Sequence, residues 1–157
     1  YNVISEVLTI GGGAGSKSFW RVFRVKLLTA NTGTSNSGNI TVTVDSKTAG
    51  HIPATYAQSL QCNYTVPAGH TAYIMQVDVG VDEKEKPIHA VIKARDNTVT
   101  SAAFQTKMYM VIESNWVTQP LTSPIVLPEK TDIELRAKSP AGELEVSGGF
   151  EVFLQNN

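Results

Sequence analysis

The sequence predicts an all-β protein, an antiparallel β-sandwich of jelly-roll type with about nine to ten strands. The first observation is a period-two alternation of apolar and polar residues, which is typical of half-buried strands and recurs along the chain. The second is the short spacing of Gly, Pro, Asn and Asp, which favour turns. The third is that no stretch shows a persuasive helical periodicity. Since the strands spread evenly over 157 residues without a linker, we expect a single sandwich domain over residues 1–157.

The N-terminal part begins with a loose alternation from Asn2 to Ile10, which indicates a strand. Phe19–Leu28 is predicted to be a long strand with apolar residues on both faces. Asn31–Asn39 holds only Asn, Thr, Gly and Ser, so we expect a surface loop there. Ile40–Val44 alternates cleanly and predicts a strand with one buried face. Ser46–Gln58, which contains a Gly and a Pro, is expected to cross the molecule irregularly.

The Pro67-Ala68-Gly69 turn is the point around which we expect the remaining strands to be organised. Pro67 presets φ for the first central position of a β-turn, and Gly69 tolerates a positive φ. Apolar residues alternate on both sides of the turn, which predicts one strand before it and one after it. These residues are Leu60, Cys62, Tyr64 and Val66 before the turn and Tyr73, Met75, Val77 and Val79 after it.

The C-terminal part predicts further strands separated by turns. Asp82–Pro87 is a mixed charge run expected at a solvated hairpin tip, and 139–143 is a second turn. Gly148 and Gly149 are expected to mark a bulge or bend. The expected strands are Ile88–Arg95, Phe104–Ile112, Ile125–Leu127, Ile133–Lys138 and Leu144–Leu154.

Composition excludes several classes of partner. The formal net charge is −1, so the chain lacks the basic character expected of a nucleic-acid or anionic-membrane binder. No apolar run approaches the 18 or more residues of a membrane-spanning helix. The single cysteine, Cys62, excludes an internal disulfide framework and is interpreted as a small buried apolar residue. We therefore expect neither nucleic acid nor a membrane as a partner.

No motif indicates an enzyme, a metal site or a cofactor. The Gly11–Ser18 segment resembles a phosphate-binding loop only superficially, since Ser16 interrupts the Gly-Lys pair and no helix follows. The three histidines lack metal-ligand spacing. Two alternatives stay open: carboxylates brought together in space for glycoside hydrolysis, and a sugar-stacking platform of aromatic residues. The candidates for that platform are Trp20, Trp116, Tyr56 and Tyr73.

Three segments resemble small virion structural proteins of tailed bacteriophages. They are Gln58–Leu60 running into Tyr64–Ile74, then Glu129–Ala137, and finally Phe150–Leu154. The resemblance covers roughly the C-terminal 100 residues and lies in the combination and order of the segments. Such proteins decorate capsids or form fibres and spikes, commonly as trimers of jelly-roll subunits. The resemblance implies a structural or binding role and transfers no catalytic residue.

The first functional hypothesis is a capsid decoration (cement) protein, located on the virion's capsid surface, that binds the major capsid protein. The alternative is a tail-fibre or spike domain that binds host surface glycans through Asn31–Asn39 or Asp82–Lys86. A third hypothesis, a host carbohydrate-binding module, requires exposed coplanar aromatic rings.

We further expect a homotrimer with the strand around Met108–Ile112 at the contact. Tyr109 and Val111 are predicted to face outward where a sandwich strand should be polar, while Met108 and Met110 face the core. The two-faced strand Phe19–Leu28 is expected to add to this apolar patch. The alternative is that a loop, Ser46–Gln58, covers that face. The interface candidates are Met108, Tyr109, Met110, Val111, Trp20 and Val22.

Overall fold

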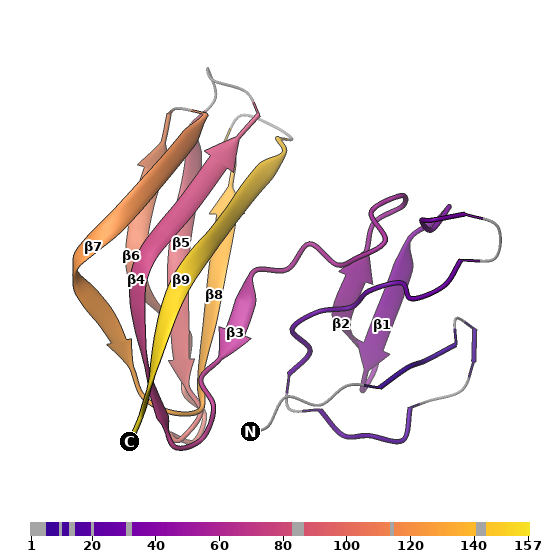
Figure 1. Ribbon diagram of the computed structural model, residues 1–157, viewed down its shortest axis with the longest axis horizontal. Helices are drawn as coiled ribbons and strands as arrows, with labels where there is room; N and C mark the ends of the chain where they lie inside the picture. Colours follow the sequence, from indigo (N-terminus) through magenta and orange to yellow (C-terminus); the bar gives the residue numbers. More distant parts are fainter. Residues whose placement is uncertain are drawn as a thin grey trace. The chain divides into compact units, whose positions relative to one another are not determined.

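The computed structural model describes residues 6–9, 11–12, 15–19, 21–30, 33–82, 87–113, 115–140 and 144–157. In these residues the chain is all-β, with nine strands and no helix, which confirms the predicted fold class (Figure 1). The chain separates into two compact units, Asn2–Gln61 and Cys62–Asn157. The strands are β1 (Ile40–Val44), β2 (Lys47–Ile52), β3 (Asn63–Thr65), β4 (His70–Val81), β5 (Ile88–Asp96), β6 (Gln105–Ile112), β7 (Trp116–Leu127), β8 (Thr131–Lys138) and β9 (Val146–Asn156).

The C-terminal unit is a β-sandwich of two antiparallel sheets. One sheet has four strands in the order β3-β8-β5-β6, and the other has three in the order β7-β4-β9. In Figure 1 the three-stranded sheet forms the front layer of this unit and β5, β6 and β8 lie behind it. Among the described strands β3 to β9, only β5 and β6 follow one another in the sequence and also lie in the same sheet. The turn at Pro67–Gly69 therefore joins two sheets and does not close a hairpin.

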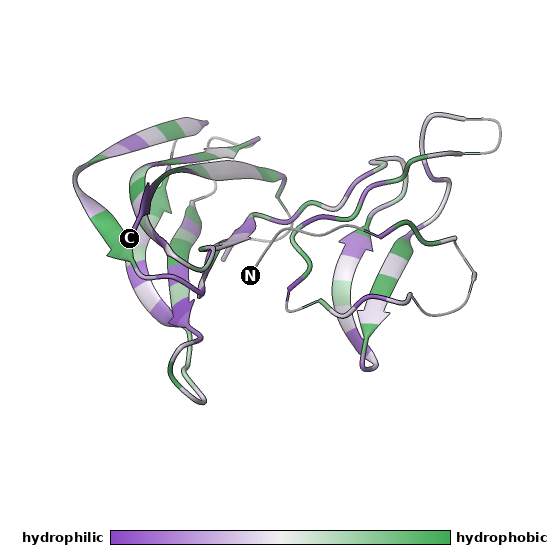
Figure 2. Cartoon of the chain, turned by 60° about the horizontal axis from the view of Figure 1, so that its bottom comes forward, coloured by the Kyte–Doolittle hydropathy of each residue, from purple (hydrophilic) through white to green (hydrophobic). Residues whose placement is uncertain are grey.

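The core lies between the two sheets and is made almost entirely of aliphatic side chains. Along β5 the burial alternates strictly, as the alternation of apolar and polar residues predicted. Figure 2 shows the same alternation as bands of hydrophobic and hydrophilic colour along the strands. The buried residues of this core are Val66, Ala72, Ile74, Val77, Val79, Val81, Ile88, Ala90, Ile92, Ala94, Ile112, Leu127 and Ile133.

A β-bulge in β4 changes which residues of that strand face the core. The pairing of β4 with β9 is regular up to Ile74 and resumes at Gln76, so Met75 is an extra residue. Before the bulge Ile74 points inward, and after it Val77 points inward. The sequence predicted that Tyr73, Met75 and Val77 share one face. That prediction is wrong, because the extra residue leaves Met75 exposed and turns Val77 into the core.

Two glycines in the sandwich have separate reasons for lacking a side chain. Gly69 has a φ of +75°, as the turn predicted, and the space around its missing Cβ is open. Gly148 approaches its neighbours closely, since a Cβ there would lie 2.9 Å from the carbonyl oxygen of Asp78. Of the bulge or bend expected at Gly148-Gly149, the bulge is wrong, since β9 pairs regularly there and the register shift lies at Met75, and the bend stays a prediction.

The N-terminal unit contains the antiparallel hairpin β1-β2. Strand β1 was predicted with the observed bounds, whereas β2 lies inside Ser46–Gln58, which was expected to be irregular. The hairpin turns at Asp45 and Ser46, which have φ values of 49° and 62°. Two successive positive φ values match the type I′ turn that suits a two-residue hairpin loop. Such turns usually contain glycine, which Asp45-Ser46 lacks, so little in the sequence indicated this hairpin.

The predicted strand at Phe19–Leu28 is not formed by its described residues. The backbone N–H of Leu27 donates to the carbonyl of Ala57, and that of Ser59 donates to the carbonyl of Val25. A single bridge joins Lys26 and Gln58. The segment thus pairs with an irregular stretch that cannot continue a ladder, and its alternation does not produce a strand.

The polar loop before β1 is irregular, as predicted, but one of its residues is a buried anchor. Asn36 is buried, and its side-chain amide donates to the carbonyls of Gly38 and Pro53, each at 2.8 Å. Its Oδ1 accepts from the N–H of Ala57 at 2.9 Å. Since these bonds tie the loop to residues 53–57, the loop contributes to the packing of this unit.

Several predictions fall wholly or partly outside the described residues. Residues 6–9 of the expected strand Asn2–Ile10 are not in a strand, and 2–5 and 10 lie outside. Most of the charged tip 82–87 and of the turn 139–143 also lies outside. The sandwich occupies the C-terminal unit, so a single domain over residues 1–157 stays a prediction.

Candidate interaction surface

The outer face of the four-stranded sheet presents the residues that the sequence singled out on β6. This strand pairs with β5 on one side and is the last strand of its sheet as described. Tyr109 is 55% exposed and Val111 is 48% exposed. Met108 and Met110 are half-buried and pack against the core. The alternation predicted for this strand, with the methionines inward and the other two residues outward, is therefore present.

Two residues of β5 complete a continuous patch with Tyr109 and Val111. Val91 lies directly across from Tyr109, and His89 lies across from Val111. The Nδ1 atom of His89 forms a hydrogen bond with the hydroxyl of Tyr109, and the two ring centroids are 5.7 Å apart. We call these four residues the β5–β6 patch. It combines apolar area with two ring edges that can form hydrogen bonds, a mixture common in protein interfaces.

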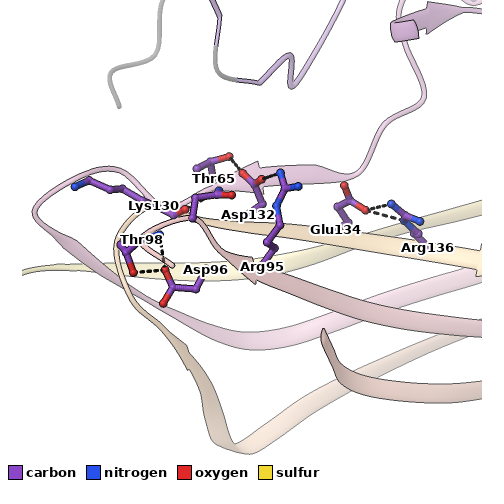
Figure 3. Close-up of polar contacts among 9 residues, drawn as sticks. Thr65, Arg95, Asp96, Thr98, Lys130, Asp132, Glu134 and Arg136 are labelled. Atoms are coloured by element: carbon purple, nitrogen blue, oxygen red, sulfur yellow. Dashed lines mark hydrogen bonds and ion pairs between the residues drawn. The ribbon is translucent and has the colours of Figure 1, made fainter. Parts of the chain in front are cut away.

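A charged cluster occupies the other end of the same sheet (Figure 3). Asp132 on β8 is 0% exposed. One of its carboxylate oxygens accepts from the hydroxyl of Thr65 at 2.5 Å, and the other accepts from Nη2 of Arg95 at 2.6 Å. These bonds join β3, β5 and β8, because Thr65 and Arg95 both lie across from Asp132 in the sheet. The cluster therefore fixes the short edge strand β3 to its sheet.

Phe104 lies between this cluster and a second ion pair. The guanidinium carbon of Arg95 is 4.7 Å from the centre of the Phe104 ring, and that of Arg136 is 5.6 Å from it. Arg136 also donates from Nε to Glu134 at 2.6 Å. Every carboxylate of the cluster is thus engaged by a cation or a hydroxyl, which is the arrangement of a structural network more than of a reactive site.

The outer face of the three-stranded sheet carries a second apolar patch, which the sequence analysis did not find. Tyr73 on β4 lies across from Val126 on β7 and from Phe153 on β9. The centroids of the Tyr73 and Phe153 rings are 6.2 Å apart. The side chains of Met75, Val126 and Phe153 are exposed. We call these four residues the Tyr73 patch. In the sequence, Tyr73 stands out only as one residue of an alternating strand and as one aromatic residue of a possible sugar-stacking platform.

The remaining candidate residues lie outside the described residues or in the other compact unit. Trp20 lies outside the described residues, and Val22 is half-buried in a segment without strand structure in the other compact unit. The side chains of the described residues include no group of three or more His, Cys, Asp or Glu placed to hold a metal ion. No described helix is long and apolar enough to cross a bilayer.

Perturbed titrating groups lie away from both patches. Burial raises the pKa of the half-buried Cys62 thiol and also that of Tyr64. The pKa of Glu129 is lowered, first because its carboxylate accepts a hydrogen bond from the N–H of Gly69 and then because Lys130 is near. The pKa of Asp96 is lowered by hydrogen bonds from Thr98. These shifts follow from turns and burial, and none gathers with others in a cleft as catalytic groups do.

No protein-family model, curated protein or solved structure matches this chain. The two apolar patches, and the fold that positions them, are therefore the features from which a function is inferred.

Proposed function

We propose that this chain is a capsid decoration (cement) protein of a tailed bacteriophage, which binds the major capsid protein and stabilises the shell as a homotrimer. The observation that carries the proposal is the exposed β5–β6 patch at the open edge of the four-stranded sheet. It contains Tyr109 and Val111, two large apolar side chains that face solvent on the edge strand β6. Exposed apolar area of this kind marks surfaces that bind other proteins.

The sheet edges differ in how they are protected against pairing. Strand β3 has three residues, and β7 carries Pro120 and Pro124, which cannot donate to a ladder. Strand β6 has a register shift near Lys107, but the five residues from Met108 to Ile112 contain no charge and no proline. Because natural edge strands usually carry such protection, its absence here favours a partner at this edge. We assign the contact between copies of the chain to β6.

A cement protein needs a second surface, because one contact must join its own subunits and another must hold the shell. The Tyr73 patch supplies a surface on the opposite sheet, away from β6. Both patches have exposed aromatic or aliphatic residues, and neither contains a lysine or an arginine. We assign the Tyr73 patch to the coat protein. The jelly-roll connectivity and the trimeric state are part of this proposal and come from the resemblance to phage virion proteins.

The self-association is tested with Tyr109→Glu. A carboxylate buried in an interface without a partner costs several kcal/mol, so the oligomer seen for the wild type by light scattering should dissociate. Thr106→Glu is the matched control, since it places the same side chain at an exposed position on the same strand outside the patch. A wild type that is monomeric at micromolar concentration contradicts self-association, and an oligomer untouched by Tyr109→Glu contradicts the assignment to β6.

The capsid role is tested separately by binding. Virions that carry this chain should hold it in hundreds of copies, and purified protein should cosediment with shells that lack it. Phe153→Glu, on the Tyr73 patch, should abolish cosedimentation and leave the oligomer intact. A copy number of tens or fewer would exclude decoration and favour a tail location.

A further inference from the structure

The indole of Trp116 lies against bare backbone at one end of the three-stranded sheet. Trp116 begins β7 and lies across from Gly80 on β4. A Cβ added to Gly80 would lie 2.3 Å from Cε3 of the indole and 2.8 Å from Cζ3. The ring therefore occupies the place that a side chain at residue 80 would take. Trp116 is still 56% exposed, so much of the indole remains open to solvent.

A hydrogen bond also holds the indole in place. Its Nε1 donates to the hydroxyl of Thr118 at 3.1 Å. Thr118 is two residues along β7 and projects from the same face of the sheet. The ring is thus held by its hydrogen bond to Thr118 and by its contact with the backbone at Gly80. An exposed aromatic ring held in this way forms a flat binding platform at little cost in conformational entropy.

Polar groups stand beside the ring on the same face. Asp78 and Gln76 precede Gly80 by two and four residues on β4, so Asp78 lies about 7 Å along the strand from the position under the ring. The Gln76 amide donates to both Asp78 oxygens, at 3.2 and 3.3 Å, which orients the carboxylate. Gly149 lies across from Asp78 on β9, and a Cβ there would meet nothing within 4 Å. The surface beside Asp78 is therefore open.

We infer that the face made by Trp116, Asp78, Gln76 and Thr118 binds a neutral saccharide. The face of a sugar ring that carries its C–H bonds packs on an aromatic ring, while its hydroxyls need acceptors and donors at the ring edge. The indole supplies the first requirement, and the carboxylate, amide and hydroxyl supply the second. An apolar protein partner would leave Asp78 buried without enough hydrogen bonds, which is costly.

The charge of the sheet selects against acidic sugars. Strands β4, β7 and β9 contain no lysine or arginine, and they carry Asp78 and Glu151 on the outer face. A sialylated or sulfated glycan would bring a further negative charge to this surface, and none of the three strands carries a lysine or an arginine to receive it. The inference does not rest on the capsid role proposed above, since it involves neither β6 nor the Tyr73 patch.

The test is a titration of the full-length, 15N-labelled protein with lactose and maltotriose as neutral probes. We expect millimolar affinity for at least one of them and a shift of the Trp116 indole N–H resonance, identified by its absence in Trp116→Phe. Trp116→Ala should weaken binding about tenfold or more. Asp78→Asn keeps the shape and should also weaken binding, so the inference can be checked even if Trp116→Ala fails to fold.

Two controls locate the site and its charge preference. Phe153→Ala removes an exposed aromatic residue from the same sheet at the other end of β4 and should leave the affinity unchanged. The charged probe 3′-sialyllactose should bind several times more weakly than lactose. No shift of the Trp116 resonance up to tens of millimolar of either neutral sugar would overturn the inference. Equal sugar affinity of Trp116→Ala and the wild type would show that the site does not lie at Trp116. Equal affinity for lactose and 3′-sialyllactose would contradict the selection against acidic sugars.

Discussion

Replacing Arg95 with methionine tests whether the charged cluster holds the edge of the four-stranded sheet. Asp132 is 0% exposed and accepts from Nη2 of Arg95 at 2.6 Å and from Thr65 at 2.5 Å. Arg95→Met keeps most of the aliphatic stem and removes the guanidinium. The carboxylate then stays buried without the Arg95 guanidinium, and the free energy of unfolding should fall.

The magnitude follows from the exposure of each partner. Removing one member of a buried ion pair typically costs 3–5 kcal/mol, whereas exposed pairs contribute about 0–1 kcal/mol. The side chain of Arg95 is 36% exposed, so solvent already screens part of this pair. We therefore expect a loss near the low end, about 3 kcal/mol. The matched control is Arg136→Met, whose side chain is 56% exposed at its pair with Glu134, and it should cost no more than about 1 kcal/mol.

The assay is urea unfolding of the full chain, followed by tryptophan fluorescence and circular dichroism. The double variant Arg95→Met, Asp132→Leu should recover part of the loss, since no carboxylate is then left buried. A loss of stability in Arg95→Met no larger than that in Arg136→Met would refute the role assigned to Arg95. A double variant that is no more stable than Arg95→Met would place the cost in lost packing and not in the buried carboxylate of Asp132.

Three further outcomes are expected. Gly69→Ala should lose about 1 kcal/mol or more in urea unfolding, because the φ of +75° is unfavourable for alanine although the space for its Cβ is open. The lowered pKa of Glu129 means that its carboxylate stabilises the fold above its unfolded pKa, about 4.3, and that this is lost as the pH falls through the lower folded value. Glu129→Gln should therefore be less stable than wild type at neutral pH, and the difference should vanish in acid melts. Burial raises the pKa of Cys62, so iodoacetamide should alkylate the native thiol much more slowly than the thiol in urea.

The sequence predicts strands well where each of them alternates without interruption. Residues 88–94 alternate strictly, and β5 buries the expected side chains because it lies in the middle of its sheet with partners on both sides. β6 was predicted with nearly the observed bounds, and its methionines and outward residues take the expected faces. In these strands the local pattern and the tertiary environment agree, so period two alone identifies the faces.

The errors arise where the pairing partner decides the outcome. Phe19–Leu28 has the composition of a strand but meets an irregular stretch around Ala57, so no ladder forms. The reverse holds for β2, whose sequence is unremarkable but which pairs with β1 through the turn at Asp45-Ser46. Strand propensity measures how well side chains fit a pleated surface, and it cannot supply the neighbouring strand.

The core-facing side of the three-stranded sheet and the side chains on its outer face both depend on the bulge at Met75. Without the extra residue, the face that carries Tyr73 would also carry Val77 and Val79, and these would leave the core. The bulge lets one strand send Tyr73 outward at one end and Gly80 outward at the other. Tyr73 then meets Phe153, which is distant in the sequence, and Gly80 receives the indole of Trp116. Neither contact follows from a local pattern, since each requires the register of β4 against β7 and β9. A single inserted residue thus positions both the patch that we assign to the coat protein and the platform that we assign to a saccharide.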